Sequence, residues 1–187
     1  MLPRARSESL FLRFPFNHTG DTAQKHDAIR GLLKARGYEV ATCTIDNSDP
    51  MFASAYARAL ARRDSDAIEK IRQEYLSHSA AIIDYYVALH RQVFGRETPH
   101  VMLLHANRFN ADALDDILRM FEERQFRFVG LSEAQSDPAY QTPDALTKFG
   151  PMWGYRWARS LGVNVNPRVE PEPADWISRY ADNKPAK

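Results

Sequence analysis

The stretch HVMLLHANRFNADALDDIL, residues 100–118, contains the local pattern that decides the fold. It begins with four apolar residues between His100 and His105, which predict a buried strand. Asn110 is a good helix-capping residue and predicts the start of a helix that runs to about residue 124. The apolar residues of that helix recur at helical spacing, at Leu114, Ile117, Leu118 and Phe121. The stretch therefore predicts a buried strand followed by an amphipathic helix.

The same alternation of strand and helix continues on both sides of this stretch. Short apolar or β-branched runs predict further strands, at residues 10–14, 38–45 and 126–130. Helical spacing predicts helices between them, at about residues 22–36, 52–62 and 65–94, with a short helix over 132–139. The longest is either one helix or a pair bent near Ser77-His78-Ser79. Such an alternation implies parallel strands with helices packed outside, and strands this apolar are typical of a sheet covered on both faces.

The number of predicted strands limits the possible architectures. Four strands are too few to close a parallel barrel, which in its common form has about eight. The sequence therefore favours an α/β fold, either an open sheet or a partial (β/α) barrel from which strands in front of Leu10 are absent. Beyond Tyr140, prolines and aromatic residues interrupt the alternation. We therefore expect a partial barrel domain, residues 1–140, and a C-terminal extension rich in proline and aromatic residues, 141–187, whose aromatic side chains attach it to the domain.

Composition narrows the classes of function and of partner. The chain has 187 residues and a formal net charge of +1, whereas a nucleic-acid-binding domain usually carries a basic excess, so no nucleic-acid partner is expected. The sequence shows neither a membrane span of about 18 apolar residues nor a secretory signal at residues 1–9, which favours a cytoplasmic protein without a membrane partner. The single cysteine, Cys43, lies in an apolar run and is expected to be a buried, unreactive thiol.

Polar residues gather at the C-terminal ends of three predicted strands. Arg13 and Pro15 lie at the end of the first, Asp46 and Asp49 follow the second, and His105 ends the third. These ends of parallel strands lie on one face of the sheet, where sites form in α/β proteins. A histidine oriented by a carboxylate, together with a fixed cation, is suited to hydrolysis. Taken singly, each also has a structural explanation: an ion pair for the arginine, a turn for the aspartates and a core position for the histidine.

The strings around these residues resemble a known family. Arg-Phe-Pro-Phe at 13–16, Asp-Asn-Ser-Asp at 46–49 and Leu-Leu-His at 103–105 are similar, in the same order, to the last three of the five motifs of the polysaccharide deacetylase (NodB-like) family, carbohydrate esterase family four. The resemblance covers roughly residues 10–140. It implies a distorted (β/α) barrel that hydrolyses acetyl groups on sugars with a divalent metal such as zinc. The expected partner is then an acetylated carbohydrate or a small amide substrate.

The resemblance also implies a role for each residue at the strand ends. His105 would be the general acid that protonates the departing amine, and Asp46 the carboxylate that orients it. Arg13 would hold the base aspartate of the family. Asp49 and Pro15 would face the substrate, although Pro50 stands where the family usually has an aromatic residue.

Two motifs of the family have no counterpart in this sequence. The Thr-Phe-Asp-Asp motif, which supplies the base and one metal ligand, does not occur, and no two of the six histidines are four residues apart, as the His-x-x-x-His motif requires. No metal ligand is therefore assigned, His18 and Asp21 being weak candidates, and no cofactor is expected in this chain. The chain alone is expected to be inactive.

Alternative interpretations remain open on the sequence alone. The first is a deacetylase lineage whose N-terminal part is missing from this chain. The second is a non-catalytic carbohydrate-binding or interaction protein on the same fold, and the third an open-sheet α/β protein unrelated to deacetylases. In a partial barrel the strand at residues 10–14 or a neighbour would form an exposed edge, and such edges pair with other chains. The sequence therefore also predicts that the chain forms a homo-oligomer or aggregates through an exposed sheet edge, or covers that edge with its aromatic C-terminal segment.

Overall fold

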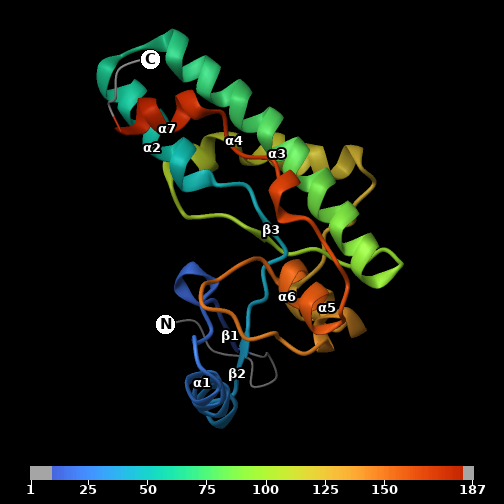
Figure 1. The fold of residues 1–187 in the computed structure, drawn as a ribbon. Helices are drawn as coiled ribbons and strands as arrows, with labels where there is room; N and C mark the ends of the chain where they lie inside the picture. Colours follow the sequence, from blue (N-terminus) through green and yellow to red (C-terminus); the bar gives the residue numbers. More distant parts are fainter. Residues whose placement is uncertain (1–9, 183–187) are drawn as a thin grey trace, which may run out of the picture. The chain divides into compact units, whose positions relative to one another are not determined.

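The computed structural model describes residues 10–182, which form an α/β structure of many helices and a few short, parallel strands (Figure 1). The described residues divide into two compact units. The first unit contains residues 10–44, 89–101 and 129–165, and the second contains residues 45–88, 102–128 and 166–182. The predicted α/β class with parallel strands is confirmed. The prediction about a secretory signal at residues 1–9 lies outside the described residues.

The first unit is built on a parallel pair of strands, β1 (Leu10–Leu12) and β2 (Tyr38–Val40). The helix α1 (Ala23–Ala35) connects them, as the alternation of elements predicts. Thr22 caps α1, because its side-chain oxygen accepts a hydrogen bond from the backbone N–H of Lys25 at 3.3 Å. The other elements of the unit are the 3₁₀ turns η1 (Pro15–Asn17) and η2 (Pro138–Gln141) and the helices α5 (Leu131–Gln135) and α6 (Trp153–Ser160).

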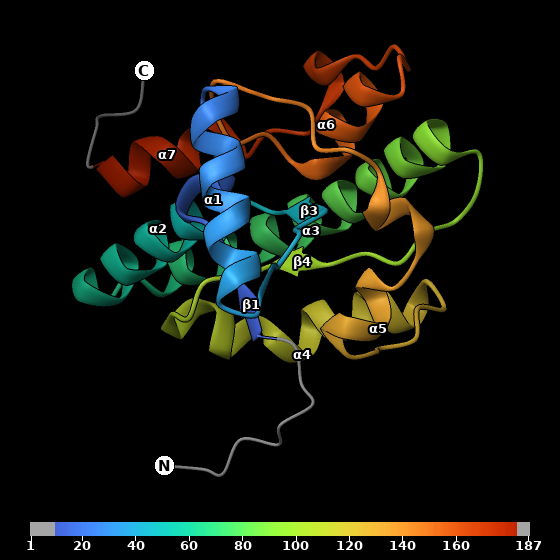
Figure 2. The same cartoon turned by 90° about the horizontal axis from the view of Figure 1, so that it is seen from below.

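The second unit contains the other parallel pair, β3 (Ile45–Asp46) and β4 (Met102–Leu103). Its other elements are the helices α2 (Asp49–Arg62), α4 (Arg108–Glu123) and α7 (Asp175–Asp182), the 3₁₀ turn η3 (Pro167–Val169) and most of α3 (Ser65–Phe94), which continues into the first unit. α3 is one continuous helix, so the alternative of two helices bent near residue 78 is not the one adopted. Both views show α7 beside α2 (Figures 1 and 2), where the Nε of Arg58 donates to the carbonyl oxygen of Ala181 at 3.0 Å.

The strands are shorter than the sequence predicts. The expected strand at 38–45 is divided into β2 and β3, which belong to different units. The expected strand at 126–130 is not formed. The predicted cap of α4 is also wrong: Asn107, and not Asn110, accepts the capping hydrogen bond, from the backbone N–H of Asn110 at 2.8 Å. Asn110 is instead turned inward and is 7% exposed.

Aromatic rings dominate the interiors of both units. In the first unit, the ring of Trp157 contacts those of His90, Phe94 and Tyr140, with centroids 5.3–5.5 Å apart. In the second unit, four rings pack in a chain: Phe52, Tyr75, Phe109 and Tyr56. Cys43 is buried, as predicted. Between residues 10 and 182, no helix combines the length and the apolar character needed to cross a membrane.

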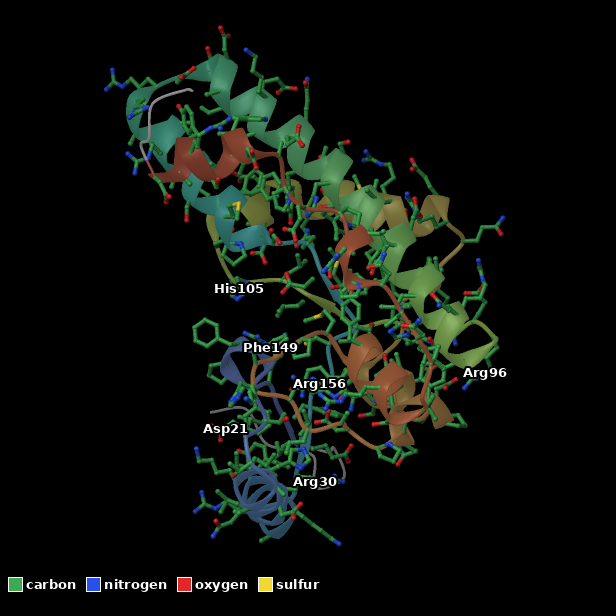
Figure 3. All side chains as sticks on the ribbon, in the orientation of Figure 1. Asp21, Arg30, Arg96, His105, Phe149 and Arg156 are labelled. Carbon is green, nitrogen blue, oxygen red and sulfur yellow. The ribbon has the colours of Figure 1, made fainter. Side chains whose placement is uncertain are left out.

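The segment after residue 140 contributes to both units. Residues 141–165 belong to the first, where Trp153 and Trp157 of α6 are buried as expected, whereas Phe149 is 69% exposed (Figure 3). Residues 166–182 belong to the second. The segment also packs against the turn after β1: a Cβ on Gly150 would lie 1.7 Å from the carbonyl oxygen of Phe16, so only glycine fits there.

Candidate active site

The β3–β4 pair brings two predicted site residues together at one edge of the second unit. Because the strands are parallel and Asp46 lies opposite Leu103, the residues that follow both strands leave at the same edge. Asp49 reaches this edge as the first residue of α2, after a turn in which Ser48 has left-handed backbone geometry with φ of 58°. His105 reaches it two residues after β4 (Figure 3).

Asp49 holds the ring of His105 in a fixed orientation. The Nδ1 atom of His105 lies 2.9 Å from Oδ1 of Asp49, and the backbone N–H of His105 donates to Oδ2 at 3.2 Å. Because an ionised carboxylate only accepts hydrogen bonds, the ring donates from Nδ1, which leaves Nε2 as the atom available for proton exchange. The carboxylate is fully buried, whereas the side chain of His105 is 41% exposed. A buried acceptor thus orients a histidine whose ring remains accessible.

Two asparagines complete the environment of the Asp49 carboxylate. The Nδ2 atom of Asn107 donates to its Oδ2 at 3.0 Å, and that of Asn110 donates to the same oxygen at 2.5 Å. Asn110 also donates to the carbonyl oxygen of His105 at 2.8 Å, so it contacts both members of the pair. The start of α4 therefore fixes the histidine and the carboxylate together.

A second layer of polar side chains supports these asparagines from inside the unit. The hydroxyl of Tyr75 donates to Oδ1 of Asn110 at 2.7 Å. The Nδ2 atom of Asn47 donates to the hydroxyl of Tyr75 at 2.8 Å and to Oγ of Ser79 at 2.9 Å. Burial raises the pKa of Tyr75 far above its usual value, so its hydroxyl stays protonated as a donor. Oδ1 of Asn47 is buried and has no hydrogen-bond partner among the described residues. The three side-chain hydrogen bonds of Asn110, to Asp49, His105 and Tyr75, nevertheless fix the position of Asn110.

The roles assigned to the two aspartates require correction. The resemblance made Asp46 the orienting carboxylate, but the carboxylate that hydrogen-bonds His105 is Asp49. Oδ1 of Asp46 accepts instead from the backbone N–H of Ser48 at 2.9 Å, which stabilises the turn before α2. Burial, and then the charge of Asp49, raise the pKa of Asp46, while the Ser48 N–H and His105 oppose that rise. Asp49 was expected to face a substrate, and its complete burial is inconsistent with that role.

The remaining predicted residues lie in the other unit. Arg13 and Pro15 belong to the first unit, at the end of β1 and the start of η1, whereas His105 and the two aspartates belong to the second. Arg13 is partly exposed and Pro15 is exposed. Of the predicted site residues, the structure thus brings together the histidine and the two aspartates. Arg13 and Pro15 belong to the other unit.

The described residues do not fit the divalent metal that the resemblance implies. From residue 10 to residue 182, no group of three or more histidine, cysteine, aspartate or glutamate side chains is placed to hold a metal ion. Of the weak candidates, Asp21 forms an exposed ion pair with Lys25 at 2.8 Å, which also lowers the pKa of Asp21. No step that requires a metal is therefore derived from these residues.

The sequence alone did not indicate the asparagines of the site. Asn110 was interpreted as a helix cap, whereas it belongs, with Tyr75, to the polar network behind Asp49. One available signal was the recurrence of asparagine at positions 107 and 110, since a cap residue and a side chain three positions later lie on the same turn of a helix. No family model, curated protein or solved structure matches this chain.

Proposed function

We propose that this chain carries the general-acid part of a hydrolase of the polysaccharide deacetylase type, on a partial (β/α) barrel. The reaction would remove acetyl groups from amino sugars or cleave a related C–N bond. The observation that carries the proposal is the 2.9 Å contact between Nδ1 of the accessible His105 and the buried carboxylate of Asp49. The resemblance of the three motifs at residues 13–16, 46–49 and 103–105 supplies the substrate class.

The chemistry of the pair suits protonation of a leaving group. In the protonated state His105 donates from Nδ1 to Asp49 and presents a second N–H at Nε2. Transfer of that proton to the nitrogen of a scissile amide would convert the departing group into a neutral amine. Asp49 accepts the Nδ1 hydrogen bond and stabilises the imidazolium, as a buried carboxylate does beside a catalytic histidine.

The pair does not supply a nucleophile, which amide hydrolysis also requires. In the related family, motifs absent from this sequence provide the base and the metal ligands. We therefore expect the purified chain to bind no stoichiometric zinc or cobalt and to release no acetate from acetylated chitooligosaccharides above background. Metal content by elemental analysis and an acetate-release assay measure both expectations.

A positive test requires the missing motifs to be supplied. We expect acetate release when the full chain is fused behind an N-terminal segment that carries Thr-Phe-Asp-Asp and His-x-x-x-His, and we expect His105→Ala to abolish it. The matched control is His18→Ala, which removes an imidazole from the other unit and should retain activity. A folded fusion that is as active with His105→Ala as without it would refute the proposal, and so would one equivalent of metal bound to the chain alone together with acetate release.

A further inference from the structure

The first unit contains a cavity of about 350 Å³ that the proposed chemistry does not use. It is partly open to solvent and is lined mainly by residues of α1, β2 and α6 and by residues 140–144. Its volume lies within the range of small-molecule sites in proteins, which is roughly 300–1,000 Å³. No residue of the His105–Asp49 pair contributes to its lining.

About half of the lining of the cavity is apolar. The apolar part consists of Phe14, Ile29, Val40, Tyr140, Pro143, Trp153 and Trp157. The hydroxyl of Tyr140 donates to the carbonyl oxygen of Pro99 at 3.0 Å, so this end of its ring is already engaged elsewhere. Such walls favour a ligand with an apolar surface of its own.

Asp144 is the one acidic side chain among the lining residues, and its contacts are long. Its Oδ2 atom lies 3.3 Å from Nη1 of Arg156, 3.3 Å from Oγ1 of Thr19 and 3.3 Å from Nε2 of His26. Charge-assisted hydrogen bonds are usually about 2.7–2.9 Å long. The contacts of Asp144 are longer, so its carboxylate, although neutralised by Arg156, can still accept a hydrogen bond from a better-placed donor. A ligand hydroxyl would be such a donor.

Four further polar side chains of the lining have no hydrogen-bond or ion-pair partner among residues 10–182. They are Arg30 from α1 (labelled in Figure 3), Thr42 after β2, and the neighbouring pair Gln141 and Thr142. Arg30 offers only donors, whereas Gln141 and Thr142 offer both donors and acceptors. Together with Asp144, they place hydrogen-bond donors and acceptors beside the aromatic and aliphatic part of the lining.

We propose that this cavity is a binding site for a neutral pyranose ring. A pyranose has apolar C–H faces for the aromatic walls and a rim of hydroxyl groups that both donate and accept, which matches the two kinds of polar group around the cavity. A purely apolar ring would leave the polar groups unsatisfied, at a cost of about 1–3 kcal/mol for each buried one. An anionic ligand would be attracted by Arg30 but would also approach the carboxylate of Asp144, so its charge gives it no net advantage over a neutral ring. The site lies in the first unit and does not depend on the hydrolytic role proposed for the second.

The test is a titration of the full chain with methyl β-D-glucopyranoside, followed by the indole N–H signals of its three tryptophans in NMR spectra. Saturable shifts of two of the three signals are expected, because Trp153 and Trp157 line the cavity. The double variant Arg30→Gln with Gln141→Ala should weaken binding at least about tenfold, the loss expected for one hydrogen bond to a charged group. The matched control is Lys34→Gln, which removes the same charge from α1 at a position outside the lining.

Further binding measurements distinguish this proposal from its alternatives. His105→Ala should leave the binding unchanged, so a failure of the proposed hydrolytic function would not alter the result. Sodium D-glucuronate, which has the same ring with a carboxylate, should bind no more tightly than the neutral glycoside, and cyclohexanol should not bind. Stronger binding of the glucuronate, no saturable binding of the glycoside, or a cavity double variant that binds as well as the wild type would each overturn the proposal.

Discussion

The guanidinium carbon of Arg156 lies 4.2 Å from the ring centroid of Trp153, one turn earlier on α6. The arginine side chain is fully buried. It donates to the carbonyl oxygen of Pro151 at 2.9 Å, to Oγ1 of Thr19 at 3.0 Å and to the carbonyl oxygen of Asn17. Burial lowers the pKa of Arg156, while the carboxylate of Asp144 opposes that effect. One cation thus joins α6 to the turn after β1.

Replacing this arginine should destabilise the first unit strongly. Arg156→Met removes the charge at similar length. It leaves the carbonyl oxygens of Pro151 and Asn17 without this donor and Asp144 without its guanidinium partner. We expect a loss of about 3 kcal/mol in the free energy of unfolding, measured by urea titration. Arg159→Met, on the exposed side of the same helix, is the control and should change that free energy by less than about 0.5 kcal/mol. Equal effects of the two variants would contradict this account.

The two aspartates of the candidate site should respond in opposite directions to the same substitution. Asp49→Asn places an amide N–H₂ among donors from His105, Asn107 and Asn110. We therefore expect a loss of about 3 kcal/mol in the free energy of unfolding. Asp46→Asn keeps an oxygen for the Ser48 N–H and removes a charge that burial disfavours. It should leave the stability unchanged or raise it by up to about 1 kcal/mol at pH 7. Urea titrations of both variants provide the measurement, and a larger loss from Asp46→Asn would show that the assignment of Asp49 is wrong.

The first unit should lose stability in acid because of two buried histidines. Burial, with a smaller contribution from the charge of His100, lowers the pKa of His90 to about 3. Burial lowers the pKa of His100 to about 4, a shift that Glu97 opposes. Since both values lie below the usual 6.5, the unfolded chain binds protons first as the pH falls. Their contribution to stability is therefore complete above pH 6.5. Below that pH it declines to about pH 4 for His100 and to about pH 3 for His90, by at most about 1.4 kcal/mol per pH unit for each histidine.

Unfolding titrations at several pH values would measure this slope. His90→Gln should reduce it, because glutamine does not titrate, although the variant will also be less stable at neutral pH. His18→Gln, at a partly exposed position, is the control and should retain the full slope. A slope that is unchanged in the His90 variant would contradict the prediction.

The first strand should promote self-association. Among residues 10–182, β1 pairs only with β2, so one edge of β1 has no strand partner there. Leu12 on this strand is 37% exposed, and unpaired apolar edges favour pairing between chains. We expect light scattering to show dimers or larger species of the full chain, and Leu12→Lys to shift the distribution toward the monomer. Leu146→Lys, at an apolar residue 40% exposed in the same unit, should have no such effect. A wild-type chain that stays monomeric at submillimolar concentration would refute the prediction.

The sequence predicted the type of most elements but not the length of the strands. Helical spacing located α3 and α4 to within a few residues, because a long amphipathic stripe is a strong signal. The run from residue 38 to residue 45 is uniformly β-prone, yet only its two ends pair with other strands. Pairing depends on where the partner strand begins and ends, and β-propensity carries no information about that.

At the candidate site, the sequence predicted the sheet edge on which the site lies, but not which aspartate pairs with His105. Residues at the ends of parallel strands converge, and this rule brought His105 and the aspartates together. Whether Asp46 or Asp49 reaches His105 depends on the left-handed turn at Ser48. Serine rarely adopts this backbone conformation, so local sequence does not predict it. The network of Tyr75, Asn47 and Ser79 was equally inaccessible, because helical spacing shows which side chains share a face but not whether that face is polar inside.

The contact between Gly150 and Phe16 limits which sequences can adopt this structure. Any side chain at position 150 would occupy the space of a backbone carbonyl, which cannot move away as a flexible side chain could. Gly31, in the middle of α1, has no atom within 4 Å of the corresponding Cβ position, and alanine there would favour the helix by about 1 kcal/mol. In a library of single substitutions, position 31 should therefore tolerate many amino acids, whereas position 150 should retain glycine regardless of the polarity or charge of the alternative.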